Sequence, residues 1–230
     1  MDNRVIDQQA YLIHRKDYRN NSLILELFTQ DFGRVSLLAR GAKNSKTPAK
    51  FQPFQLLQVS WVGATELKTL TSLDAGRQII EHQLYFAALY VSELLLLFLP
   101  KGENSELLFK SYQQFLLQLT EQTIQSQLRT FETKLMLFSG LMPDISCDAI
   151  SYEPIQANKF YQFYPDSGFV KSNNNENIFS GEAILKWLEQ DFDNNAVKNL
   201  ARVIMRSIID FNLNGKRLKS RDIYQQLKNS

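Results

Sequence analysis

A series of short extended runs at the start of the chain is the strongest constraint on its fold. Apolar and β-branched residues gather in five such runs, and turn-forming sequences such as Gln30-Asp31-Phe32-Gly33 separate them. The intervals are too short for a crossover helix, so the strands must pair largely in antiparallel fashion. The sequence therefore predicts a small antiparallel barrel with strands at 10–14, 22–29, 34–40, 55–62 and 67–73.

Five short strands in about 65 residues are typical of the OB-fold, the five-stranded member of the small Greek-key barrels. An SH3-like barrel stays open as the alternative, because the number of strands does not separate the two. We predict an OB-fold, nucleic-acid-binding domain over residues 1–78.

After Gly76 the apolar residues recur at helical rather than strand spacing. Pro143, Pro154 and Pro165 interrupt this pattern, and Pro165-Asp166-Ser167-Gly168 predicts a hairpin turn between residues 160–164 and 169–171. The fold class is therefore α+β, with a barrel followed by a helical bundle domain over 79–230 that carries an irregular insertion at about 141–178. Helices are expected at 84–99, 104–119, 123–139, 180–192, 195–211 and 221–228.

Composition and the start of the chain indicate a cytoplasmic protein. The chain has 230 residues and a single cysteine, which excludes a disulfide framework. No apolar run follows a basic start, so no secretory signal is expected. The longest apolar run, residues 84–99, is shorter than the ~20 residues of a membrane span and contains Glu93.

The sequence contains no recognisable catalytic motif, and we predict a binding protein without a cofactor rather than an enzyme. Gly215-Lys216 lacks the upstream glycine and the following Ser or Thr of a phosphate-binding loop. His14 and His82 lie far apart, and Cys147 has no histidine nearby in the sequence. A metal site at Asp191 and Asp193 is not expected, since charge runs at helix ends are usually solvated.

Positive charge is concentrated in two segments, although the net charge is only +2. Residues 32–68 carry +5 and residues 194–230 carry +6, whereas residues 69–193 carry −8. No acidic residue lies between Asp31 and Glu66, which predicts a surface for a phosphate backbone, with an ordinary solvated loop as the alternative. The cations of this stretch are Arg34, Arg40, Lys43, Lys46 and Lys50.

The second basic segment is patterned for a helix and its following loop. Lys198, Arg202 and Arg206 recur every four residues and so share one helical face, which predicts a polyanion surface or a plain solvent face. We expect this segment to share one groove with the barrel cations. The cations that follow the helix are Lys216, Arg217, Lys219 and Arg221. Aromatic residues accompany the barrel strands, and we expect one or two to stack on bases and the rest to be core: Phe28, Phe32, Phe51, Phe54 and Trp61.

Several segments together resemble the RecO family of bacterial recombination-mediator proteins. They include Ala-Tyr-Leu-Ile-His-Arg-Lys-Asp-Tyr at 10–18, the run 27–41, Gln-Pro-Phe at 52–54 and Leu-Lys-Thr-Leu at 67–70. Further matches are Tyr-Val-Ser-Glu-Leu-Leu at 90–95, Leu-Arg-Thr-Phe-Glu at 128–132 and Lys-Arg-Leu-Lys-Ser-Arg at 216–221. Each motif is short, but their shared order along the chain is specific.

The resemblance implies an OB-fold, a helical domain and an insertion that holds a four-cysteine zinc site in many relatives. This insertion offers only Cys147, so zinc is not expected and hairpin packing must hold it together. The resemblance also implies binding of single- and double-stranded DNA, and hence a nucleoid-associated protein in the cytoplasm. It further implies annealing of strands covered by single-stranded DNA-binding protein (SSB). With RecR, and indirectly RecF, such proteins help to place RecA on covered DNA, without nucleotide hydrolysis.

Zinc-free relatives bind the acidic, phenylalanine-ended tail of SSB on the helical domain. The matching motif makes Arg129 the candidate for the tail carboxylates, with Leu128 and Phe131 as apolar neighbours. A plain ion pair with Glu132 is the alternative role of Arg129, and Thr130 stands where some relatives have arginine. Two other functions stay open: a general RNA-binding barrel, and an adaptor that binds SSB and RecR without DNA.

Overall fold

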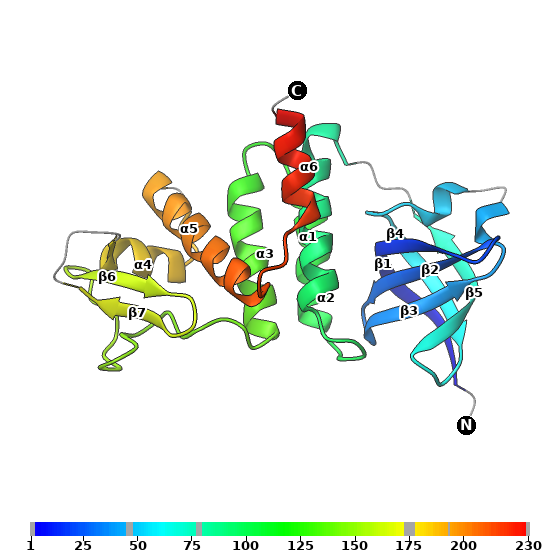
Figure 1. Cartoon of the computed structure of the whole chain (residues 1–230), viewed down its shortest axis with the longest axis horizontal. Helices are drawn as coiled ribbons and strands as arrows, with labels where there is room; N and C mark the ends of the chain where they lie inside the picture. Colours follow the sequence, from blue (N-terminus) through cyan, green and yellow to red (C-terminus); the bar gives the residue numbers. More distant parts are fainter. Residues whose placement is uncertain (1–2, 45–47, 77–79, 173–177, 193, 229–230) are drawn as a thin grey trace. The chain divides into compact units, whose positions relative to one another are not determined.

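The chain folds into a five-stranded barrel followed by helices and a small second sheet (Figure 1). The computed structural model describes residues 3–44, 48–76, 80–172, 178–192 and 194–228. The barrel strands are β1 (Arg4–Tyr18), β2 (Ser22–Thr29), β3 (Gly33–Ala39), β4 (Leu56–Val62) and β5 (Leu67–Ala75). The α-helices are α1 (Tyr85–Phe98), α2 (Glu106–Gln118), α3 (Ile124–Phe138), α4 (Gly181–Leu188), α5 (Asn195–Asn212) and α6 (Lys219–Lys228).

The barrel is closed in the order β1-β2-β3-β5-β4, which confirms the expected OB-like barrel and the α+β class. All neighbours are antiparallel except β3 and β5, which pair in parallel and complete the closure. Leu25, Leu27, Leu37 and Val59 are fully buried inside it. Strand β1 starts six residues earlier than predicted, because its polar first half pairs with β4 through the backbone and needs no apolar pattern.

The outer side of β1 and β2 is covered by α2. Tyr11 and Phe28, which face each other in the strand register, are buried against Phe109 and Tyr112 of this helix. Ring centroids lie 5.2 Å apart for Tyr11 and Tyr112 and 5.3 Å apart for Phe28 and Phe109. This packing explains why both faces of β2 are apolar, because one face fills the barrel and the other meets a helix.

Contacts divide the chain into two compact units. The first comprises the residues up to Glu121 together with those from Ile223 on, and the second runs from Gln122 to Asp222. Helices α1 and α2 therefore belong with the barrel, because their side chains cover its strands. The expected domain boundary after residue 78 stays a prediction.

Gly33, at the start of β3, allows the barrel to meet the segment after α1. Its φ of 59° is in the left-handed region, and a Cβ there would lie 1.9 Å from the carbonyl oxygen of Glu103. The neighbouring Arg34 carbonyl accepts a hydrogen bond from the Gly102 N–H at 3.1 Å. Only glycine fits this approach without displacing the backbone.

The second unit joins α3, α4 and α5 to the insertion. The predicted hairpin is confirmed as β6 (Phe160–Tyr164) and β7 (Gly168–Lys171), and β8 (Phe179–Ser180) pairs with the other edge of β6. Helix α4 ends at Leu188 rather than at residue 192. Its chain turns at Gln190, whose φ is 59°, so the helical backbone does not continue.

Candidate nucleic-acid interface

The barrel cations lie around the ends of the strands and in the connection between β3 and β4. Arg40 follows β3 and is exposed. Lys43 and Lys50 belong to two short 3₁₀ helices, Ala42–Asn44 and Pro48–Phe51, where the sequence indicated only a loop. Lys46 lies outside the described residues.

Lys43 and Lys50 each have a carboxylate partner from a barrel strand. The Lys43 ammonium lies 2.9 Å from Asp17 Oδ2, and the Lys50 ammonium lies 3.4 Å from Asp74 Oδ1. Both carboxylates are largely exposed, at 80% and 82% of their side-chain surface. Exposed pairs of this kind contribute about 0–1 kcal/mol, so a phosphate can replace the carboxylate at small cost.

Arg34 is held more firmly than the other barrel cations. Its Nη1 donates to the Leu96 carbonyl oxygen near the end of α1, and its Nε is buried without a hydrogen-bond partner among the described residues. The fold also brings Lys16 and Lys101 beside it, which the sequence analysis did not single out. Lys16 stands two residues after His14 on β1. Alternate residues of a strand face the same side, so this spacing could have indicated from the sequence that Lys16 and His14 share a face.

Phe32 is the exposed ring among the five aromatic residues singled out from the sequence. It lies in the turn between β2 and β3 and is 39% exposed, and its ring is nearly perpendicular to that of Trp61, with centroids 5.3 Å apart. The other four rings are buried, so the expectation that most would be core is correct: Phe28, Phe51, Phe54 and Trp61.

The second basic segment forms a surface of its own on the second unit. Arg202 and Arg206 are exposed on α5, and Lys198 is half-buried. Asp210 links this helix to the start of α6, because it pairs with both Arg206 and Arg221. The remaining cations of this segment, Lys216, Arg217 and Lys219, are exposed.

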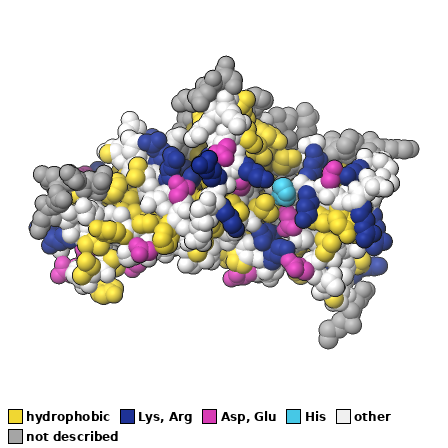
Figure 2. Space-filling model, in the orientation of Figure 1, with side chains coloured by type: hydrophobic (Ala, Val, Ile, Leu, Met, Phe, Trp, Pro, Cys, Tyr) yellow, Lys and Arg dark blue, Asp and Glu magenta, His cyan; other side chains and the backbone are white. Residues whose placement is uncertain are grey.

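The shared groove expected from the sequence stays a prediction, because the two basic sets belong to different units. Figure 2 shows Lys and Arg side chains interspersed with acidic ones.

Arg129 lies on α3 with its side chain turned inward. The residue is 7% exposed, and its Nη2 donates to Glu132 Oε1 at 2.8 Å. Glu132 is fully buried, so this is a buried ion pair rather than the surface pair considered from the sequence. Phe131 is also buried, at 2% exposed, and Leu128 is half-buried. A peptide carboxylate at Arg129 would have to share its guanidinium with Glu132.

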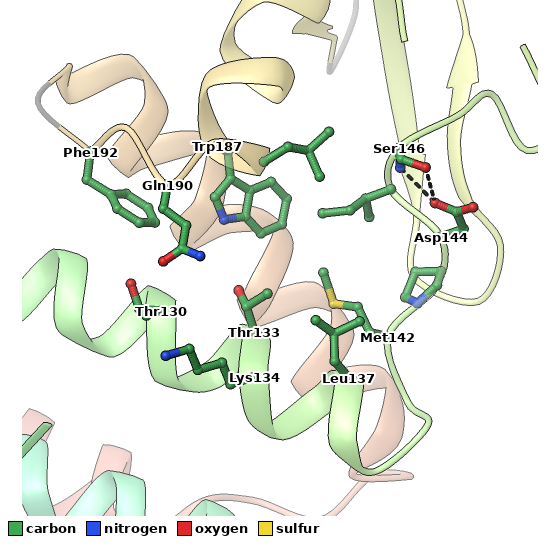
Figure 3. A pocket seen from close by; sticks show the side chains of 13 residues that line it. Thr130, Thr133, Lys134, Leu137, Met142, Asp144, Ser146, Trp187, Gln190 and Phe192 are labelled. Carbon is green, nitrogen blue, oxygen red and sulfur yellow. Dashed lines mark hydrogen bonds between the residues drawn. The ribbon is translucent and has the colours of Figure 1, made fainter. Parts of the chain in front are cut away.

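A pocket of about 490 Å³ opens beside the same helix (Figure 3). Thr130, Thr133 and Lys134 of α3 line one side, and the rings of Trp187 and Phe192 line another. Apolar residues form most of the wall, with Lys134 and Asp144 as its charged members. Such a pocket is of a size and character to take an aromatic side chain. The sequence reasoning missed it, because its walls come from three separate segments.

The insertion contains the single cysteine of the chain, Cys147, where the resemblance implied four cysteines in many members of the family. The Cys147 thiol donates to Asp144 Oδ2 at 3.4 Å, and desolvation together with the Asp144 carboxylate raises the pKa of this thiol. A neutral thiol is a poor metal ligand. In the part of the chain that the structure describes, no three His, Cys, Asp or Glu side chains form a cluster suited to a metal ion.

Asp148 takes the structural role at the centre of the insertion instead. Its Oδ1 accepts the N–H groups of Ile150 at 2.9 Å and Ser151 at 2.7 Å, and its Oδ2 accepts that of Lys171 at 2.6 Å. One carboxylate therefore joins the loop at 148–151 to β7. Tyr161, Phe163 and Phe179 pack around Phe169 beside it.

These features define a barrel-and-helix protein of the OB class. Residues 1–78 match the family described as "Recombination protein O N terminal", and residues 82–222 match "Recombination protein O C terminal". The chain belongs to the RecO family.

Full-length relatives agree with this assignment. A protein of Methylococcus capsulatus is 35% identical over 96% of this chain and 94% of its own length, and one of Coxiella burnetii is 33% identical over 97% and 99%. A protein of Psychromonas ingrahamii is 35% identical over 94% and 96%. All three are named DNA repair protein RecO. Among the helices in the described part of the chain, none has the length and hydropathy of a membrane span.

Proposed function

We propose that this chain is a non-catalytic mediator of DNA repair and recombination. It binds single- and double-stranded DNA, anneals complementary strands covered by SSB and, with RecR, helps to load RecA. Membership of the RecO family supports the repair and recombination role. The observation that carries DNA binding is the acid-free stretch between Asp31 and Glu66, whose described cations lie on the barrel surface.

The mechanism is electrostatic. Lys43 and Lys50 exchange their exposed carboxylate partners for backbone phosphates, and Arg40 contributes a further exposed guanidinium. Each neutralised phosphate releases counterions and lowers the repulsion between two approaching strands. Phe32 adds a stacking surface for an unpaired base, worth about 1–3 kcal/mol. Base pairing then supplies the sequence specificity of annealing.

We further propose that the SSB tail docks on the helical domain beside α3. The pocket lined by Lys134, Trp187 and Phe192 suits its terminal phenylalanine, and Lys134 suits a carboxylate. Arg129 stays the sequence-based candidate for the tail carboxylates, with Leu128 and Phe131 as neighbours. Arg129 is buried and Lys134 is half-buried, so Lys134 is the more accessible cation of the two.

Strand annealing of naked and SSB-coated DNA tests both proposals, DNA binding by the barrel cations and docking of the SSB tail beside α3. Changing Arg40 and Lys43 together to Gln is expected to slow annealing on both substrates, because backbone contacts are lost. Thr130→Trp, which fills the pocket, is expected to slow annealing of coated DNA only. Unchanged annealing by the variant with Arg40 and Lys43 replaced would favour the hypothesis of an adaptor that does not bind DNA. Equal annealing of RNA and DNA would favour the hypothesis of a general RNA-binding barrel.

A further inference from the structure

The loop that precedes the β6–β7 hairpin presents two apolar side chains to solvent. Ile150 is 73% exposed and Tyr152 is 79% exposed, whereas Phe169 of the same insertion is fully buried among three other rings. The backbone of Tyr152 has a φ of 59°, in the left-handed region that aromatic residues rarely adopt. Backbone strain beside exposed apolar side chains is typical of a binding surface.

Hydrogen bonds fix the shape of this loop. The Asp148 carboxylate accepts three backbone N–H groups, two of them from the loop itself. The Asp148 N–H donates to the Glu153 carbonyl oxygen at 2.8 Å, and the Tyr152 N–H donates to the Asp148 carbonyl oxygen at 2.9 Å. The exposed side chains therefore stand on a braced turn, which reduces the conformational entropy that is lost when a partner binds.

The charge around these side chains is negative. No lysine or arginine lies between Lys134 and Lys159, and three acidic residues do, which gives this stretch a net charge of −3: Asp144, Asp148 and Glu153. Around the β6–β7 hairpin, Figure 2 shows hydrophobic side chains with acidic ones beside them. We call residues 144–153 the insertion tip. Its charge opposes a phosphate backbone and favours a cationic protein surface.

Helix α6 has an exposed apolar face of the opposite charge. Ile223 and Tyr224 lie four and three residues before Leu227, so these side chains share one helical face, and all three are exposed. The Phe86 ring of α1 lies against Tyr224, with centroids 6.2 Å apart, yet more than half of the Tyr224 surface is still exposed.

The cations of this region lie at the start of α6 and in the connection before it. Residues 216–227 hold four basic residues and one acidic residue, a net charge of +3. Lys216, Arg217 and Lys219 are exposed, and Asp210 of α5 pairs with Arg221, which lowers the excess by at most one. We call residues 216–227 the C-terminal face.

We propose that the insertion tip of one copy of this chain docks on the C-terminal face of a second copy. Each surface exposes apolar side chains, and their charges are opposite. Contact between them therefore removes apolar surface from water and brings carboxylates to cations. Because the two surfaces differ, the contact is head-to-tail, and each pair keeps one tip and one C-terminal face for further copies. This association requires no DNA and goes beyond the proposed function.

Sedimentation velocity without DNA, over a range of protein concentrations, tests this contact. The wild-type chain is expected to sediment faster as its concentration rises, and less so at high salt, because salt screens the charges. The tip variant carries Ile150→Ser and Tyr152→Asn, since asparagine tolerates the left-handed backbone. The C-terminal variant carries Ile223→Gln and Leu227→Gln, which keeps the contact of Tyr224 with Phe86.

Each variant is expected to weaken association by about tenfold or more, as the loss of apolar anchors does. Val203→Ser is the matched control and should associate like the wild type, because Val203 is an exposed apolar residue of α5 outside both surfaces. All these changes are at exposed positions, and circular dichroism equal to that of the wild type checks the fold. Glu153→Lys, which keeps the apolar side chains, should weaken association at low salt.

An equal mixture of the two double variants identifies the contact. The tip variant keeps an intact C-terminal face and the C-terminal variant keeps an intact tip, so the mixture should form dimers that neither forms alone. The absence of such dimers would overturn the proposal, and so would a wild-type chain that sediments as a monomer at every concentration. Loss of oligothymidine binding by the tip variant with unchanged sedimentation would assign the tip to DNA instead, and would equally overturn it.

Discussion

Replacing Asp148 by Asn removes one charge from the insertion without changing the shape of the side chain. The amide oxygen of Asn can still accept from Ile150 and Ser151, whose N–H groups share Oδ1 in the wild type. The amide NH₂ then meets the N–H of Lys171, donor against donor, where Oδ2 accepts at 2.6 Å. The variant therefore loses the bond that joins the loop to β7.

The expected cost follows from this loss. A hydrogen bond to a charged group contributes about 1.5–3 kcal/mol, and an unsatisfied buried N–H adds a cost of the same order. Asp148 is only 5% exposed, so water can do little to replace the lost hydrogen bond or to satisfy the unpaired N–H. We expect the second unit to lose about 2–4 kcal/mol of unfolding free energy.

Urea unfolding followed by tryptophan fluorescence measures this change. Trp187 lies in the second unit and Trp61 in the first, so a Trp61→Phe background isolates the signal of the second unit. Asp166→Asn is the matched control, because Asp166 is exposed in the β6–β7 turn and is expected to change stability by less than about 0.5 kcal/mol. Equal unfolding midpoints for the two variants would refute the role of Asp148.

The same contact predicts a dependence on pH. Burial raises the pKa of Asp148, but the N–H groups of Ser151, Lys171 and Ile150 outweigh it, so the pKa lies below its ordinary value. A carboxyl whose pKa is lower in the folded than in the unfolded state stabilises the fold at pH values above the unfolded-state pKa. This stabilisation is lost as the pH falls through the folded-state pKa. The difference between wild type and Asp148→Asn should therefore shrink below the ordinary aspartate pKa of 3.8. A difference that stays constant through this range would contradict the reasoning.

Three further predictions concern the barrel and α3. Phe32→Ala should weaken binding of single-stranded DNA by about 1–3 kcal/mol in anisotropy titrations with little change in melting temperature, whereas Phe28→Ala, buried against α2, should cost about 3–5 kcal/mol of stability in urea. Gly33→Ala should lower the melting temperature measured by circular dichroism, because its Cβ would overlap the Glu103 carbonyl; an unchanged value would show that this segment yields. Arg129→Ala should destabilise the second unit by about 3–5 kcal/mol in urea, since it leaves Glu132 charged and buried. The double variant with Arg129→Met and Glu132→Leu should recover much of this loss, and an equally large destabilisation in the double variant would argue against the role of the buried pair.

The strands and helices were largely predictable, because their signals are local. Alternation and turn residues placed β2 within the range observed, and the helical period placed α5 to within one residue. The errors fall where side-chain pattern does not decide structure. The polar first half of β1 is held by backbone pairing, and α4 ends early at the left-handed Gln190.

The site was predictable only in part. Counting charges along the chain located the acid-free stretch, because charge is a property of the sequence alone. The same count did not show that Lys43 and Lys50 are paired with Asp17 and Asp74, which come from other strands. Likewise, the motif at 128–132 indicated Arg129 as a surface ligand, although α3 turns this side chain inward toward Glu132.

The sequence by itself determined the succession of strands and helices, the α+β class and the two concentrations of positive charge. These depend on residues that are near one another in the chain, where periodicity and composition act directly. Only the tertiary structure decided that Phe32 is the exposed ring, that α1 and α2 cover the barrel, and that Lys16, Arg34 and Lys101 surround one pocket. Burial and long-range pairing depend on which surfaces meet after folding, and this information is not carried by any single segment.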